Sequence, residues 1–349
     1  MSVYARNHRA RRRVPRVDGE PLLALRDVRM HFPAGGGRRG GTVKAVDGVS
    51  FTLREGETLG LVGESGCGKS TTAKLIARLL EPTGGQILYR GVDIARLGQR
   101  KLRPYRQEIQ LIFQDPFSSL NPRHTVGTII ATALRAHHIV DRSRETARVQ
   151  ELLEIVGLNP EHHGRYPHEF SGGQRQRIGI ARALAVKPRV IVADEPVSAL
   201  DVSIQAQVMN LLDELRREFG IAFVFIAHDL GVVRHFCDRV AVMYLGKVVE
   251  LGTRESLYGS PMHPYAQALL SAAPDLSGLR GAPPRARIRL VGDVPSPIDP
   301  PTGCRFRTRC WRSEERCATI EPTLTPTARD LVTACHYPEP LDPSWLEVA

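Results

Sequence analysis

Long hydrophobic runs are absent from the 349-residue sequence. The longest apolar stretch, IAFVFIA at residues 221–227, has the length of a buried strand and is well short of the roughly 18 residues that span a bilayer. We therefore do not expect this chain to cross a membrane. No apolar segment of the signal-peptide type follows the basic N-terminal stretch, so export is not expected and the cytoplasm is the expected compartment.

Cysteine is also scarce, with six residues in the chain, four of which lie in the last fifty positions. Thiols stay reduced in the cytoplasm, so this context argues against disulfides. For the C-terminal group, this context favours a metal site or reactive thiols.

Acidic residues are missing from the first 17 positions, although six arginines lie there. These arginines account for about half of the net charge of +11, and we predict that residues 1–20 form a basic, disordered arm. Because so much of the excess charge lies in this arm, it is weak evidence for a nucleic-acid partner, and none is expected.

The rest of the chain has a globular composition, with 42% apolar and 24% charged residues. Apolar strand-like runs alternate with helical periodicity from about residue 22 to residue 273, which predicts an α/β domain. The stretch VSIQAQVMNLLDELRREFG predicts an amphipathic helix from residue 202 that stops at Gly220. The flanking apolar runs RVIVAD and IAFVFIAH predict strands of a parallel sheet covered on both faces.

A phosphate-binding loop is predicted where a strand meets a helix. The run from Gly63 to Ser70 fits the pattern G-x-x-x-x-G-K-[ST], whose backbone amides surround phosphate at a helix N-terminus. Lys69 is expected to reach the β- and γ-phosphates, and Ser70 to ligate Mg²⁺. The position of Cys67 inside this loop predicts a lowered thiol pKa and a reactive thiol. The predicted ATP-binding residues of the loop are Gly63, Glu64, Ser65, Gly66, Cys67, Gly68, Lys69, Ser70 and Thr71.

Two acidic residues end a second apolar strand, VIVADEP. Asp194 is expected to hold Mg²⁺, and Glu195 to polarise a water for attack on the γ-phosphate. An acid at a strand end can also serve only as a helix cap, but the phosphate loop favours the catalytic interpretation.

The stretch FSGGQRQRIGIARAL, residues 170–184, resembles the signature sequence of the ATP-binding cassette (ABC) family. Ser171 and the amides of Gly172 and Gly173 open a helix there, followed by Gln174, and in the family this site closes over the ATP of a partner subunit.

Other motifs follow in the order of that family. Gln114 in IFQDP resembles the Q-loop glutamine, a further Mg²⁺ ligand. Asp201 in SALD resembles the D-loop aspartate, and His228 in FIAHD resembles the switch histidine that contacts the γ-phosphate. Phe32 in MHFP is a weaker candidate for the aromatic that stacks on adenine.

Longer stretches, such as HPYAQALLSAAP and VPSPIDPPTGC, are similar to the ATPase subunit of dipeptide and oligopeptide importers, over about residues 22–338. The resemblance implies a RecA-like P-loop α/β core with antiparallel β and helical subdomains, within a nucleotide-binding domain at 21–273. The helical subdomain is expected at about 116–182. Residues 274–349 are expected to form a linker and a small module with four cysteines.

The same resemblance implies an ATPase that drives peptide import at the cytoplasmic face of the membrane. The implied partners are a second, related ATPase in a heterodimer, two permease subunits and an extracellular solute-binding protein. An ATPase for nickel or another small solute is one alternative, and a soluble ABC ATPase acting on ribosomes or nucleic acid is another.

The C-terminal cysteines, Cys304, Cys310, Cys317 and Cys335, are separated by five, six and seventeen residues. Zinc modules usually contain C-x₂₋₄-C pairs, and none is present. Similar cysteine runs close the chains of the importer family, and this resemblance suggests a [4Fe–4S] cluster. Free structural thiols and zinc are the alternatives.

Overall fold

The computed structural model describes residues 20–34, 41–115, 119–272, 287–327 and 330–340. No helix in these ranges is both long and apolar enough to span a membrane. The predicted basic arm, apart from its last residue, and the first half of the predicted linker lie outside the described residues.

An eight-stranded sheet forms the centre of the chain, in the order β11-β12-β10-β9-β3-β8-β7-β6. The five strands from β9 to β6 run parallel, whereas β10, β11 and β12 join them by antiparallel pairing. Every residue of β3, β7 and β8 is buried, as expected for a parallel sheet covered on both faces. The strands are β3 (Thr58–Val62), β6 (Ile109–Ile112), β7 (Val190–Asp194), β8 (Ala222–Ile226), β9 (Arg239–Tyr244), β10 (Lys247–Thr253), β11 (Thr325–Pro326) and β12 (Leu331–Thr333).

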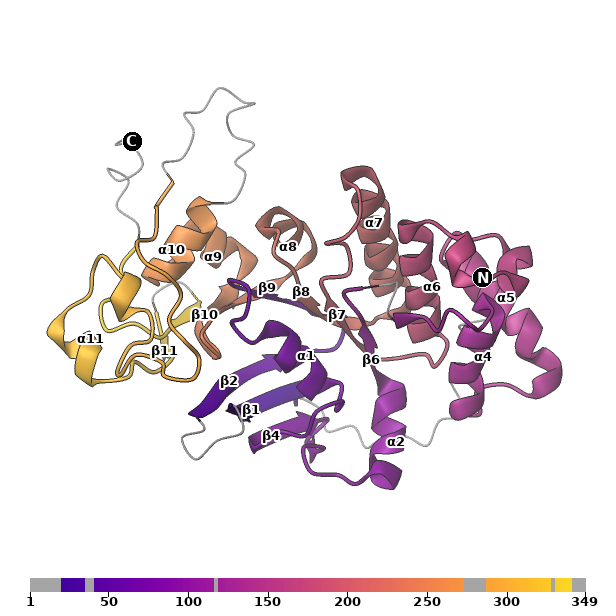
Figure 1. Ribbon diagram of the computed structural model, residues 1–349, viewed down its shortest axis with the longest axis horizontal. Coiled ribbons are helices and arrows are strands. Elements are labelled where there is room, and N and C mark those ends of the chain that lie inside the picture. The colour runs from indigo at the N-terminus through magenta and orange to yellow at the C-terminus, as the bar shows by residue number, and fades with distance from the viewer. Residues whose placement is uncertain (1–19, 35–40, 116–118, 273–286, 328–329, 341–349) are drawn as a thin grey trace.

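Helices cover both faces of this sheet (Figure 1). The helix α1 (Lys69–Ile76) lies on one face, and α7 (Val202–Phe219), α8 (Leu230–Phe236), α9 (Arg254–Gly259) and α10 (Pro264–Ser271) lie on the other. The predicted helix from residue 202 is confirmed as α7. Its C-cap, Gly220, has a φ of 62°, the left-handed conformation that ends helices.

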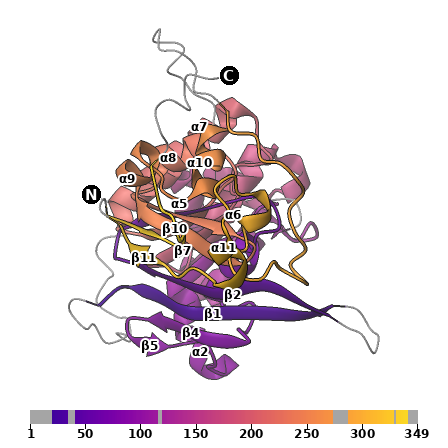
Figure 2. The same cartoon turned by 90° about the vertical axis from the view of Figure 1, so that its left-hand side faces the viewer.

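A second, antiparallel sheet has the order β2-β1-β4-β5 (Figure 2), and it lies on the same side of the central sheet as α1 (Figure 1). Its apolar residues share one buried cluster with α1 and with β3, β7 and β8. The phosphate loop before α1 therefore lies between two sheets. The strands are β1 (Leu23–Ala34), β2 (Gly41–Leu53), β4 (Gly84–Tyr89) and β5 (Val92–Asp93), and α2 (Gln99–Glu108) follows them.

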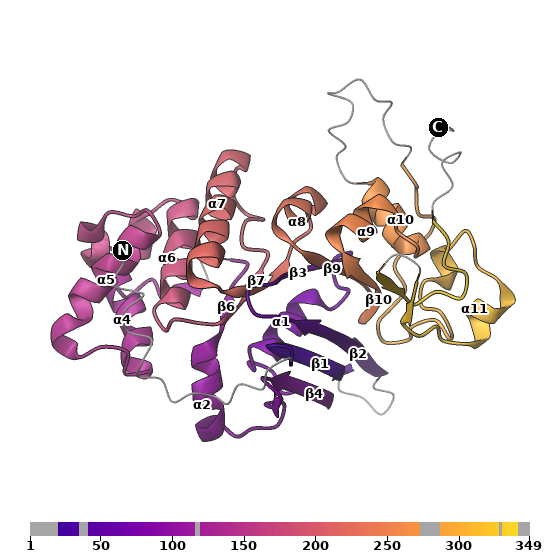
Figure 3. The ribbon, with the colours of Figure 1, turned by 180° about the vertical axis from the view of Figure 1, so that it is seen from behind.

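A helical lobe lies at one end of the molecule, seen from both sides in Figures 1 and 3. It contains α4 (Val126–Ala136), α5 (Glu145–Ile155) and α6 (Gly172–Leu184), with short 3₁₀ turns η3 (Arg142–Arg144), η4 (Pro160–Gly164) and η5 (Pro167–Glu169). Ser171 and Gln174 form a capping box at the start of α6, which satisfies the first free amides of that helix.

The C-terminal segment continues the central sheet. Its strand β12 pairs with β10, and its turn η7 (Arg307–Arg309) and helix α11 (Glu315–Thr319) lie at the same edge (Figure 2). Phe306, only 1% exposed, belongs to the larger apolar cluster, which also contains residues of the central sheet and the helical lobe. The apolar stretch RIRLVGDV at 287–294 forms no strand, and the amide of Ile288 donates to the Ser271 hydroxyl at 3.0 Å.

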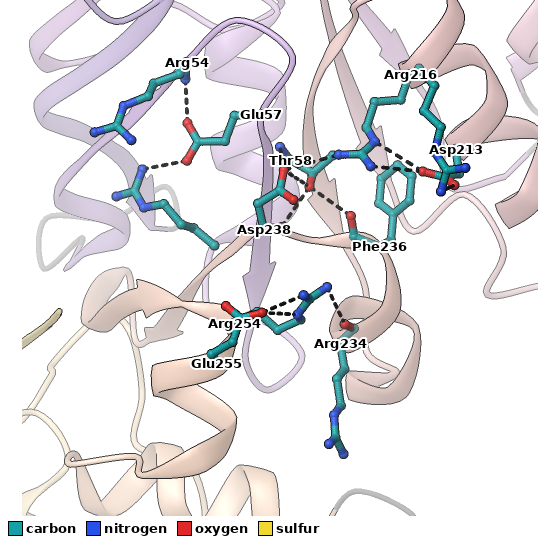
Figure 4. A network of polar contacts seen from close by, with 12 residues as sticks. Arg54, Glu57, Thr58, Asp213, Arg216, Arg234, Phe236, Asp238, Arg254 and Glu255 are labelled. Atoms are coloured by element: carbon teal, nitrogen blue, oxygen red, sulfur yellow. Dashed lines mark hydrogen bonds and ion pairs between the residues drawn. The ribbon is translucent and has the colours of Figure 1, made fainter. Parts of the chain in front are cut away.

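A polar network fixes the start of β3 (Figure 4). The amide and hydroxyl of Thr58 donate to the Asp238 carboxylate at 2.9 and 2.8 Å, and Arg216 of α7 pairs with the same carboxylate at 3.4 Å. The Asp238 amide donates back to the Thr58 carbonyl at 2.9 Å. These hydrogen bonds and the ion pair fix the N-terminal end of β3, and the phosphate loop follows its C-terminal end.

Candidate nucleotide site

The phosphate loop connects β3 to α1 as the sequence predicts. Gly63 has a φ of 150° and Gly68 a φ of 105°, where side chains are strained. A Cβ on Gly63 would lie 2.2 Å from the Met243 carbonyl oxygen, and one on Gly68 would lie 2.2 Å from that of Ala45. The loop is thus packed closely against β9 and β2, and both positions require glycine.

Lys69 and Ser70 occupy the first turn of α1. The Lys69 ammonium group, largely buried, donates to the carbonyls of Gly63 at 2.7 Å and Glu64 at 2.9 Å. The Ser70 hydroxyl donates to the Asp194 carboxylate at 3.0 Å, and burial raises the pKa of Asp194. A hydroxyl and a carboxylate side by side are the oxygen ligands that Mg²⁺ prefers, so these residues fit that ion.

The three predicted catalytic side chains meet at one carboxylate. Glu195 is 5% exposed; Gln114 donates to its Oε2 at 2.6 Å, and His228 pairs with its Oε1. Glu195 has a φ of 48°, which is a strained backbone conformation. The hydrogen bond that its amide donates to the Ile226 carbonyl at 3.0 Å helps to hold this conformation. A cavity of about 300 Å³ opens beside this group, lined by Glu195 and His228 together with Gln205 of α7 and Val232 of α8.

Other predicted residues lie further from this centre. Phe32 sits on β1 opposite Val43, half-buried, and its contact with adenine stays a prediction. Ser65 is exposed on the phosphate loop, and Thr71 follows Ser70 on α1. Their part in nucleotide binding also stays a prediction.

The signature residues belong to the helical lobe and not to the phosphate loop of the same chain (Figure 3). A Cβ on Gly173 would lie 2.3 Å from Ile204 of α7, so glycine allows α6 and α7 to approach closely. Asp201 is exposed and makes no capping bond at the start of α7. Such an outward placement is compatible with contacts to a second subunit.

The predicted reactivity of Cys67 is wrong. Burial raises the pKa of this thiol and outweighs the opposing effect of Lys69, because the side chain is only 4% exposed. The thiol belongs to a buried apolar cluster, and the Lys69 ammonium group lies 3.8 Å from its Sγ.

The [4Fe–4S] prediction for Cys304, Cys310, Cys317 and Cys335 is also wrong. Among the described residues, which include all four cysteines, no group of three or more Cys, His, Asp or Glu side chains could hold a metal ion, so zinc is not supported either. Burial raises the pKa of Cys304, Cys310 and Cys335 to about 11, which favours protonated thiols over ligand thiolates. All four are free cysteines.

Sequence reasoning missed two residues at the phosphate loop. Tyr265 of α10 accepts a hydrogen bond from the Glu64 amide at 2.8 Å, and Arg309 pairs with the Glu64 carboxylate at 2.7 Å. These contacts join positions 201 and 245 residues apart, so no local pattern could have indicated them.

Comparison with known proteins shows the family of this chain. The family described as "ABC transporter" matches residues 46–198, and the family described as "Oligopeptide/dipeptide transporter, C-terminal region" matches residues 249–317. The oligopeptide transport ATP-binding protein AppF of Bacillus subtilis (strain 168) is 55% identical over 321 residues, which cover 91% of this chain and 97% of that protein. The probable peptide ABC transporter ATP-binding protein y4tS of Sinorhizobium fredii is 50% identical, with 92% and 91% covered.

A solved structure shares the core. The dimeric, post-hydrolysis structure of the ATP-binding cassette MJ0796 bound to ADP and Pi is 30% identical, with a TM-score of 0.61, and the match covers 67% of this chain and 99% of that one. The chain therefore belongs to the ABC transporter ATPases, in the oligopeptide and dipeptide transporter family.

Proposed function

We propose that this chain hydrolyses ATP to drive the import of oligopeptides or dipeptides through permease subunits. The observation that carries the proposal is the Glu195 carboxylate, held by Gln114 and His228 next to the Ser70–Asp194 pair. Relatives named as oligopeptide transport ATP-binding proteins, aligned over nearly their whole length, support the peptide substrate.

ATP binds through its phosphates to the loop from Gly63 to Thr71. The loop amides and the N-terminus of α1 surround the β-phosphate, and Lys69 exchanges its carbonyl contacts for the β- and γ-phosphates. Phe32 stacks on the adenine. The buried position of Lys69 strengthens its attraction to the phosphate charge.

Ser70, Asp194 and Gln114 would hold Mg²⁺, which would neutralise charge on the β- and γ-phosphates. Glu195 accepts a proton from a water as that water attacks the γ-phosphate. His228 orients the carboxylate through its Oε1 and contacts the γ-phosphate in turn. The products are ADP and phosphate.

Two ATPase subunits enclose the nucleotides between them. Ser171, Gly172, Gly173, Gln174 and Asp201 of one subunit contact the ATP on the phosphate loop of the other, and the dimeric MJ0796 cassette supports this arrangement. The second subunit is a related ATPase, the assembly lies on the cytoplasmic face of the membrane, and an extracellular binding protein supplies the solute to two permease subunits.

The test is reconstitution of the full transporter in proteoliposomes. Peptide uptake that requires ATP and is lost in Glu195→Gln is the expected result. Uptake of Ni²⁺ without peptide would refute the peptide substrate, and copurification of the chain with RNA and no permease would refute transport itself.

A further inference from the structure

The segment from Gly303 to Cys310 packs against the phosphate loop. Arg309, its side chain 8% exposed, donates from Nη1 to Glu64 Oε2 at 2.7 Å and from Nη2 to Glu64 Oε1 at 3.1 Å. Glu64 is the second residue of the loop. A bidentate pair of this kind fixes both the position and the plane of the carboxylate.

A second contact holds the backbone of the same residue. The hydroxyl of Tyr265 accepts a hydrogen bond from the Glu64 amide. The Tyr265 ring is fully buried between the rings of Tyr244 and Phe306, at centroid distances of 4.7 and 5.4 Å. The His263 side chain caps α10 by accepting the Tyr265 amide at 3.0 Å. Main chain and side chain of Glu64 are thus both held by groups that follow residue 260.

The far end of the loop is held indirectly. Arg305, 8% exposed, donates to the Leu245 carbonyl and pairs with Asp47. Gly246, which follows Leu245, donates a hydrogen bond from its amide to the Cys67 carbonyl at 2.9 Å. Its carbonyl accepts a hydrogen bond from the Asp47 amide at 2.8 Å. The two arginines lie on either side of the buried Phe306, which joins them to one rigid cluster of rings.

We propose that residues 303–310 clamp the phosphate loop in its nucleotide-binding conformation, with Arg309 as a positioning residue that acts through Glu64. Arg309 does not touch substrate. It lowers the ordering cost of phosphate binding, because the amide and the carboxylate of Glu64 are already held in place before the nucleotide binds. Phosphate binding must in turn stabilise the C-terminal segment, since coupling between two sites is reciprocal.

The proposal rests on nucleotide binding in the proposed function, but on neither transport nor peptide. Arg309→Met in the full-length chain is the test, with Arg307→Met as a matched control, because among the described residues the Arg307 side chain donates only to Thr302, just before this segment. Calorimetry with Mg·ADP should give an affinity about fivefold to tenfold weaker in Arg309→Met and unchanged in the control. Hydrogen exchange should become faster in the peptide that contains residues 63–68.

A double-mutant cycle separates positioning from a general loss of packing. Glu64→Gln keeps the shape of a partly exposed side chain, and Arg309→Met with Glu64→Gln should bind Mg·ADP no more weakly than the weaker single variant. Additive losses, or equal affinities in Arg309→Met and Arg307→Met, would overturn the clamp. A wild-type chain that binds no Mg·ADP would refute the proposed function instead, while exchange at residues 63–68 would still report on the clamp.

Discussion

Glu250 makes the joint between the central sheet and the C-terminal segment sensitive to pH. Its carboxylate is fully buried on β10 and accepts the amides of Met262 at 2.7 Å and His263 at 3.2 Å and the hydroxyl of Thr333 at 3.2 Å. Burial nevertheless raises the pKa of Glu250 to about 7, because the charged form loses its hydration there.

The direction in which pH changes the free energy of unfolding follows from whether the folded or the unfolded chain releases the Glu250 proton first. The folded pKa of about 7 lies above the ordinary value of 4.5, so the unfolded chain releases this proton first as the pH rises. The contribution of Glu250 to the free energy of unfolding is therefore full below pH 4.5, falls between pH 4.5 and 7, and is level above that window. At roughly 1.4 kcal/mol per pKa unit, the whole change is about 3 kcal/mol.

His263, next to this carboxylate, acts in the opposite direction. Burial lowers its pKa to about 3 from 6.5, so its contribution to stability rises with pH between these values. The two effects oppose each other in the wild-type profile. The difference between wild type and Glu250→Gln isolates the carboxylate, because the histidine is present in both.

Urea unfolding at pH 5 and pH 8 measures this difference. The free energy of unfolding of wild type, minus that of Glu250→Gln, should fall by about 2.5 kcal/mol from pH 5 to pH 8. Glu255→Gln, on the exposed first turn of α9, is the control and should show little change. A difference for Glu250→Gln that stays constant over this range would refute the reasoning.

Four further variants test the site and its support. Glu195→Gln should bind ATP but hydrolyse it at least about 100-fold more slowly and accumulate a closed dimer in size-exclusion chromatography, and normal phosphate release would reject Glu195 as the base. Lys69→Ala should lose ATP binding or turnover in a phosphate-release assay, which an unchanged rate would contradict. Gly68→Ala should cost about 1–3 kcal/mol in chemical denaturation, because its Cβ meets the Ala45 carbonyl at a φ of 105°, and wild-type stability would be inconsistent with that strain. Phe306→Ala should cost about 3–5 kcal/mol and weaken Mg·ADP binding, whereas a neutral effect would show that the ring cluster carries little packing energy.

Short sequence patterns predicted the elements that depend only on neighbouring residues in the chain. The helix from residue 202 and its stop at Gly220 follow from apolar spacing and from the freedom of glycine to adopt a positive φ. The phosphate loop was predictable for the same reason, since its motif lies within eight consecutive residues. The stretch 287–294 has strand composition but forms no strand, because strand formation also needs a partner strand, which composition does not reveal.

Burial decided the points on which sequence reasoning was wrong. A thiol next to Lys69 in a helix-opening loop should have a lowered pKa, yet Cys67 is buried, and desolvation reverses the sign. The C-terminal cysteines are close enough to influence one another but do not form a group that could hold a metal ion among the described residues. Spacing along the chain contains neither the depth of a side chain nor the direction in which it points.

By itself, the sequence determined where the phosphate loop and its helix lie, and it predicted the roles of Lys69, Asp194 and Glu195, because short motifs link each role to a position along the chain. Tertiary structure alone brought Gln114 and His228 to the Glu195 carboxylate, and Arg309 to Glu64. The physical reason is that an ion pair depends on distance in space, and folding brings residues 245 positions apart to 2.7 Å.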